Sequence, residues 1–76
     1  MDETYRNYLG DLGYLLRELG ESARQDALAQ NSEYAQGYFM AFHRVLTLMQ
    51  QQAEAFDIPL EHLNLAGFTS ERFLAK

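Results

Sequence analysis

Cysteine is absent from the sequence, and proline occurs only once. The absence of cysteine excludes disulfides and thiolate metal ligands, two of the usual ways in which a small domain gains stability. β-Branched residues are also scarce, with one Val, one Ile and three Thr, and no alternation of apolar and polar residues persists. Such a composition argues against β-strands. The sequence therefore predicts an all-α fold.

Basic residues and long apolar runs are lacking too. Six Lys and Arg stand against eleven Asp and Glu, for a formal net charge of −5, so we expect no direct binding to nucleic acid. No apolar run approaches the roughly 18 residues that a membrane span needs, so no membrane partner is expected. The opening stretch MDETYRNYLGD is acidic and polar, unlike a secretory signal. We therefore expect a cytoplasmic protein.

The length is that of one small domain, which we expect to span residues 1–76. A chain of this length buries only roughly 60–65% of the surface that its unfolded form exposes. Its stability is therefore marginal unless something else contributes, and oligomerisation is the remaining common route.

The apolar spacing predicts two long helices. Apolar residues recur at helical intervals from Tyr5 to Leu19, which indicates a helix over about 3–19, with Gly20 well placed to end it. A second helix is expected over about 32–56, and Pro59 begins a short helical tail, residues 59–76. The predicted fold is a long two-helix antiparallel hairpin with a short helical C-terminal tail.

Residues 20–31 are expected to form a polar connector between the two helices. Ser22, followed three residues later by Gln25, is typical of a helix start, so a short helix over 23–30 fits within it. Its apolar residues are mostly alanines, so we expect it to contribute little to the core. Whether the second helix continues back through residues 22–31 is left open by the pattern.

The expected core combines the apolar faces of the two long helices. Its predicted members are Leu9, Leu12, Leu16, Leu19, Tyr38, Ala41, Phe42, Val45, Met49 and Phe56.

The two apolar faces differ in width. The face of the first helix covers roughly 120° of arc, while that of the second covers roughly 180°, so a hairpin leaves part of the second helix uncovered. A second copy of the chain would cover it, because two hairpins pack into a four-helix bundle. In the alternative, a monomeric bundle, the tail covers the whole face.

Several residues are candidates for a partner or dimer interface. Tyr, Phe and Met are enriched in interface cores, and the set expected at this interface is Phe39, Met40, Tyr38, Tyr14, Leu46, Gly10 and Gly13. In the alternative, Phe68 and Phe73 of the tail fold over Phe39 and Met40 and make them part of the core. The two glycines indicate either a close approach of another backbone or ring, or a solvated helix edge.

Residues that would support catalysis or bind a cofactor are missing from the pattern. There is no Gly-rich phosphate loop, and His43 is predicted on the solvated polar face of the second helix. Glu54, Asp57 and Glu61 have the spacing of metal ligands, but Pro59 interrupts the helix that would align them. We therefore expect no enzymatic activity, no cofactor and no metal.

The function predicted from the sequence is that of a small acidic protein–protein interaction module, of the adaptor, chaperone or inhibitor type. We expect it to act as a homodimer, with an additional unidentified protein partner left open. One alternative is a small regulator of transcription or of a nucleic-acid enzyme that binds a basic protein surface, since the chain is acidic. A minimal metal-binding protein is a weaker alternative.

Overall fold

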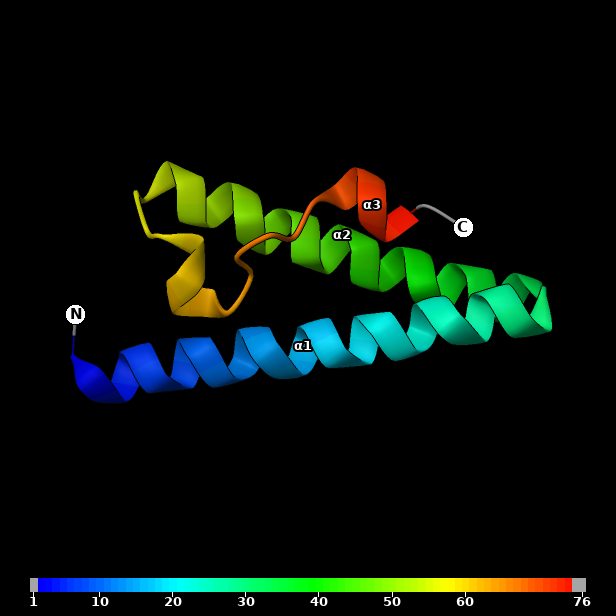
Figure 1. The fold of residues 1–76 in the computed structure, drawn as a ribbon, viewed down its shortest axis with the longest axis horizontal. Helices are drawn as coiled ribbons and strands as arrows, with labels where there is room; N and C mark the ends of the chain where they lie inside the picture. Colours follow the sequence, from blue (N-terminus) through cyan, green and yellow to red (C-terminus); the bar gives the residue numbers. More distant parts are fainter. Residues whose placement is uncertain (1, 75–76) are drawn as a thin grey trace.

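The computed structural model describes residues 2–74, and every regular element among them is helical (Figure 1). Helix α1 comprises Glu3–Gln30 and α2 comprises Glu33–Ala55. They run antiparallel, and the chain then returns through a 3₁₀ helix, η1 (Leu60–Leu63), to a last short helix, α3 (Ser70–Leu74). The predicted all-α hairpin with a short helical tail is confirmed.

The first helix is longer than the sequence pattern indicates. The prediction of a helix ending near residue 19 and a polar connector over 20–31 is wrong, because α1 continues unbroken for 28 residues. Gly20 does not end the helix but lies buried inside it. A Cβ added there would come within 3.0 Å of the Phe73 ring and 3.1 Å of the Leu46 side chain. Gly20 therefore serves packing, not helix termination.

The turn between the two helices consists of two residues with distinct roles. Asn31 adopts a left-handed conformation (φ 49°) and ends α1, donating its backbone N–H to the carbonyl of Ala27 at 3.3 Å. Ser32 caps α2, because its hydroxyl accepts a hydrogen bond from the Ala35 N–H at 3.1 Å. The second helix therefore begins at Glu33 and does not extend back through 22–31.

Local backbone features also fix where α2 ends and where the tail turns. The N–H of Ile58 donates to the carbonyl of Ala53 at 2.8 Å, and Asp57 has φ 55°, so α2 ends with a tight left-handed turn just before Pro59. The tail turns again at Gly67, whose φ of 79° suits glycine. Residues 75 and 76 of the predicted tail lie outside the described residues.

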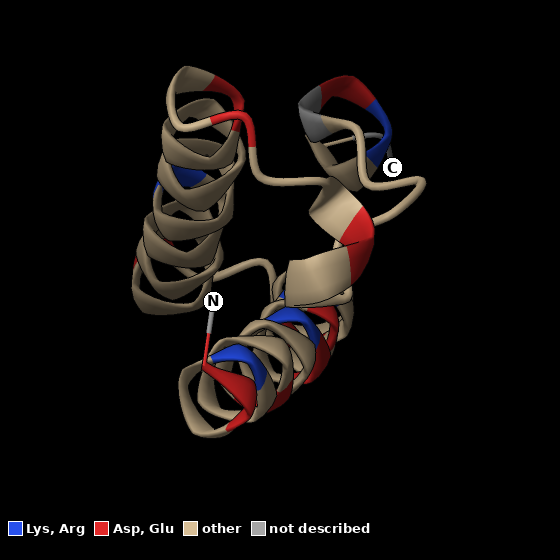
Figure 2. Cartoon of the chain, turned by 90° about the vertical axis from the view of Figure 1, so that its left-hand side faces the viewer, with Lys and Arg blue, Asp and Glu red and all other residues tan. Residues whose placement is uncertain are grey.

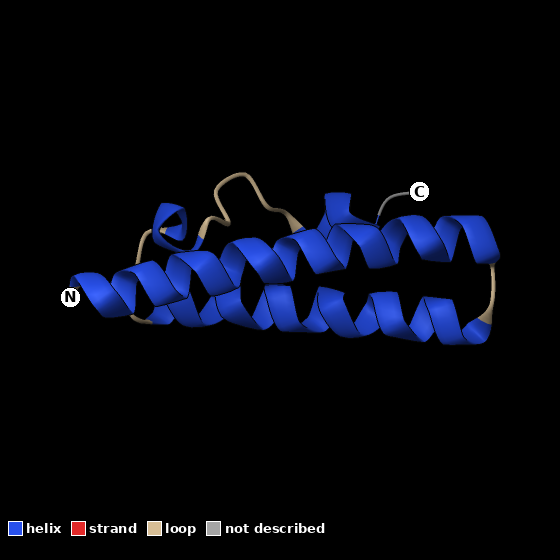
Figure 3. Cartoon of the chain, turned by 90° about the horizontal axis from the view of Figure 1, so that it is seen from below, coloured by secondary structure: helices blue, strands red, loops and turns tan. Residues whose placement is uncertain are grey.

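The tail lies along one side of the hairpin. Seen end-on in Figure 2, α1 and α2 form two corners of a triangle and the tail segments form the third. Figure 3 shows the same arrangement from below, with the tail following one side of the helix pair. Within residues 2–74, no segment covers the other side.

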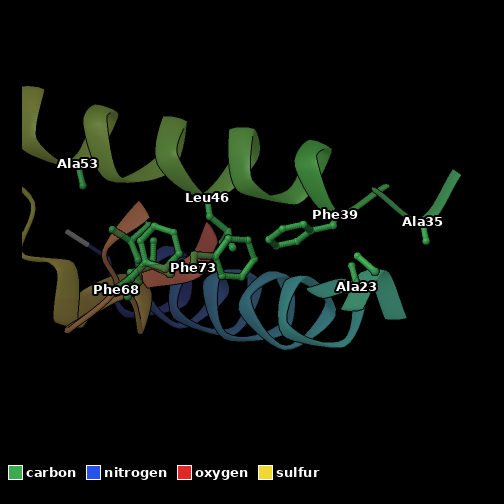
Figure 4. Packing of buried hydrophobic residues seen from close by; sticks show 10 residues of the cluster. Ala23, Ala35, Phe39, Leu46, Ala53, Phe68 and Phe73 are labelled. Carbon is green, nitrogen blue, oxygen red and sulfur yellow. The ribbon is translucent and has the colours of Figure 1, made fainter. Parts of the chain in front are cut away.

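The core lies between the two helices and the tail (Figure 4). The tail supplies Leu63, Leu65, Phe68 and Phe73, while α2 supplies Phe39 and Leu46. From α1 the buried residues are all small: Gly13, Gly20, Ala23 and Ala27. The expectation that residues 20–31 contribute little to the core is wrong, because Ala23 and Ala27 let α2 approach closely.

The predicted core is correct only in part. Leu9, Leu16, Phe42 and Met49 pack against the buried cluster. Six other predicted core residues are exposed in the single chain, namely Leu12, Leu19, Tyr38, Ala41, Val45 and Phe56. The physical reason is that the helices meet through small residues and the tail fills the remaining space. Both helices are thereby turned so that larger side chains face outward.

Candidate interaction surface

Two of the residues predicted at a partner interface lie in the core. Leu46 is fully buried, and the Phe39 ring packs against Phe73 with ring centroids 5.1 Å apart. Neither side chain is available on the surface of the folded chain, so their assignment to a partner surface is corrected. For Phe39 the alternative holds, since the tail folds over it.

The two glycines of α1 mark a close backbone approach, as one of the two interpretations predicts. A Cβ at Gly10 would lie 3.2 Å from the carbonyl oxygen of His62, and a Cβ at Gly13 would overlap the carbonyl of Leu63. The approaching backbone is that of η1 in the same chain. Gly10 and Gly13 therefore face the tail and not a second chain.

Tyr14, Tyr38 and Met40 remain exposed in the folded chain. Tyr38 stacks on Tyr34, with ring centroids 6.2 Å apart, and it forms a T-shaped pair with Phe42, with ring centroids 5.2 Å apart. Tyr14 lies on another side of the hairpin, beside the tail. Contact of these three residues with another chain stays a prediction.

Polar side chains of the helices hold the tail in place through its backbone carbonyls. Arg17 donates to the carbonyls of Asn64 and Ala66, each at 3.1 Å. Arg24 donates from Nε to the carbonyl of Phe73 at 3.1 Å, and its Nη1 pairs with Glu21 at 3.3 Å. These anchoring roles are absent from the sequence-based interpretation, because no local pattern links an arginine to a carbonyl more than 40 residues away.

An open groove of about 720 Å³ runs between α1 and the tail. Its walls include the arginines Arg17, Arg24 and Arg72 and the acidic residues Glu18 and Glu21. Arg17 and Arg24 donate to the tail, so the groove is best understood as the junction that fixes the tail on α1. Among residues 2–74 there is no group of three or more His, Asp or Glu side chains placed to hold a metal ion.

The sequence predicts His43 on a solvated polar face, but the structure places it elsewhere. It is half-buried, and its ring stacks on Phe73 with centroids 6.2 Å apart. Its Nε2 and the hydroxyl of Thr47 are buried without a hydrogen-bond partner in the described part of the chain. The polar-face prediction for His43 is wrong, because α3 folds over this side of α2.

The pKa of Tyr14 provides a test of the interaction between Tyr14 and Glu18 on α1. A hydrogen bond with Glu18 and the negative charge of that carboxylate raise the pKa of the Tyr14 phenol above its ordinary value. We expect the Tyr14 ring to titrate at higher pH than a free tyrosine side chain, whose pKa is about 10, followed by NMR of its ring carbons. Glu18→Gln should lower the pKa of Tyr14 toward about 10. An unchanged pKa in this variant would exclude Glu18 as the cause.

The larger unexplained surface lies on the side of the hairpin away from the tail. We call this side, which no described segment covers in Figure 2, the open face. By their helical spacing, exposed apolar side chains of both helices lie on it. No family model, curated protein or solved structure matches the chain. Within residues 2–74, neither long helix is apolar enough over a sufficient length to cross a bilayer.

Proposed function

We propose that this chain is a non-enzymatic protein–protein interaction module that acts as a homodimer, of the adaptor, chaperone or inhibitor type. The observation that supports it is the imbalance between buried and exposed apolar residues. Ten hydrophobic side chains of the described residues are buried, four of them alanines, while fourteen large ones are exposed. Monomeric proteins seldom expose apolar patches larger than a few hundred Å². A second copy would remove part of this surface from water.

A four-helix bundle is the form of dimer that we propose. Two-fold dimers are the commonest oligomers, and an antiparallel helix pair with one uncovered face supplies half of such a bundle. The fold provides two long antiparallel helices whose tail lies along one side only. The other side, which no segment of residues 2–74 covers, can receive a second hairpin.

Sedimentation equilibrium at micromolar concentration tests this proposal. The single chain has a mass of 8.8 kDa, and we expect the measured mass to be twice that value. The mass should shift toward that of the single chain on dilution, because association follows mass action. A mass of 8.8 kDa throughout the concentration range would contradict the homodimer.

A second candidate function is favoured by charge alone. The excess of acidic residues would suit a regulator of transcription or of a nucleic-acid enzyme that occupies a basic protein surface. Exposed charge pairs weaken strongly with salt. Binding to a basic DNA-binding protein that is lost at high salt, while the homodimer persists, would support this role. Salt-insensitive binding would count against it.

A further inference from the structure

The exposed apolar residues of α1 follow a regular spacing. Intervals of three and four residues alternate along one line of the helix, which is the spacing of helices that pack side by side in bundles and coiled coils. We call this line the α1 seam; its members are Tyr5, Tyr8, Leu12, Leu15 and Leu19, all exposed. The next positions in the same register are Ser22 and Asp26, so the apolar line ends there.

Helix α2 carries a second line with the same alternation. Intervals of four and three residues connect exposed residues over a similar length, and we call this line the α2 seam. Its members are Tyr34, Tyr38, Ala41, Val45 and Leu48. Each long helix therefore has two packing sides, one used within the chain and one unused.

Both seams lie on the open face. An α-helix turns about 100° per residue, which places the α1 seam roughly 150° around the helix from the tail contacts of Gly10, Gly13 and Arg17. The α2 seam lies roughly 170° from His43 and Gln50, which contact the tail. On each helix the buried residues lie between the tail side and the seam. Both seams therefore face the side opposite the tail, which no described segment covers in Figure 2.

The two seams contain no charged residue, although the chain has eleven acidic and six basic ones. Two copies that each carry a net charge of −5 would repel one another if acidic residues met at their interface. Seams free of charge avoid this repulsion. The seams also offer no charged side chain that could form a selective ion pair with a foreign partner.

The area of the seams is sufficient for a stable dimer. Nine of their ten members are large side chains, exposed by between 38% and 80%. A half-exposed side chain of this size presents about 100 Å², so the nine present roughly 900 Å². Stable interfaces bury about 800 Å² on each partner. A partner that matches two seams of equal length, side by side and antiparallel, is a second copy of this chain.

The geometry points to a specific dimer in which the seams of two copies pack against each other and the tails stay outside. This inference rests on the proposed function. Five of the six predicted core residues that are exposed in the single chain lie on these seams, namely Leu12, Leu19, Tyr38, Ala41 and Val45. In the dimer they are buried. Contrary to the sequence-based prediction of a partner contact, the Tyr14 and Met40 side chains, on other sides of their helices, stay in solvent in this dimer.

Two adjacent residues of α1 allow a matched test. Leu15 on the seam is 52% exposed, and Tyr14 beside the tail is 50% exposed. Leu15→Glu should reduce the mass to that of the single chain with helix content by circular dichroism unchanged, whereas Tyr14→Glu should leave the mass doubled. On α2 the same comparison pairs Val45→Glu with Met40→Glu.

Each outcome separates the two proposals. A wild-type mass of 8.8 kDa would overturn the homodimer itself, including the seam interface. A doubled mass that persists in Leu15→Glu and Val45→Glu would overturn only the seam interface. Loss of the dimer in Tyr14→Glu or Met40→Glu alone would instead place the interface where those residues lie.

A second measurement applies even if the charged variants fail to fold. Because the chain lacks cysteine, Leu15→Cys introduces a single thiol on the seam, with Tyr14→Cys as the control. At concentrations where the wild type is dimeric, maleimide should label Leu15→Cys at least tenfold more slowly. Equal labelling rates would show that the seam is open to solvent and would overturn the interface.

Discussion

Gly13→Ala is expected to destabilise the fold by about 3 kcal/mol, although alanine is the better helix former. The added Cβ would overlap the carbonyl of Leu63, which is backbone and cannot rotate away. To relieve the overlap, η1 must move off α1 and partly expose Leu63 and Leu65, both buried. Burial of each such side chain contributes about 1.5–3 kcal/mol. Urea unfolding at a fixed protein concentration measures the loss, because dimerisation makes stability concentration-dependent.

The same substitution at Gly37 is the control for this prediction. Gly37 also lies within a helix, but a Cβ there would meet no atom within 4 Å. Gly37→Ala should therefore raise the free energy of unfolding by about 1 kcal/mol, the difference in helix propensity. Similar stabilisation by both variants would show that η1 does not pack on Gly13.

Phe73→Ala should cost about 3–5 kcal/mol, as is usual when a buried phenylalanine is truncated. The centroid of the Phe73 ring lies 5.1 Å from that of Phe39 and 5.5 Å from that of Phe68, and the ring lies against Gly20. Its removal leaves a cavity among residues of both long helices and the tail. For so small a domain this loss is a large fraction of the total stability, which is about 0.05–0.15 kcal/mol per residue.

Leu74→Ala is the matched control, since Leu74 follows Phe73 in the same short helix but is exposed. A surface substitution of this kind usually changes stability by less than about 0.5 kcal/mol. If fraying of the chain end governed both positions, the two variants would have similar, small effects on the urea midpoint. That result would contradict the role of Phe73 as the residue that joins the tail to both helices.

The sequence by itself determined the helical class, the hairpin and most of its local boundaries. Pro59 follows α2, which ends at Ala55, whereas the sequence left open whether the chain is helical through Asn31 and Ser32. Gly67 turns the tail with a positive φ. These signals are readable because each depends on the backbone of neighbouring residues only. For Gly10 and Gly13 of α1 the sequence left two interpretations open, a close approach or a solvated edge, and it did not indicate which segment approaches.

Only the tertiary structure decided which side of each helix faces inward. By local rules Gly20 ends a helix, yet α1 passes through it because Phe73 and Leu46 pack over that position. Hydrophobicity alone places Leu19 inside and Ala23 outside, whereas the chain buries Ala23 and exposes Leu19. Burial here depends on how closely the two helix backbones approach and on which space the distant tail fills. Neither is encoded in the periodicity of a single helix. The same packing leaves the seam residues of both helices on the open face, where the proposed second copy would bury them.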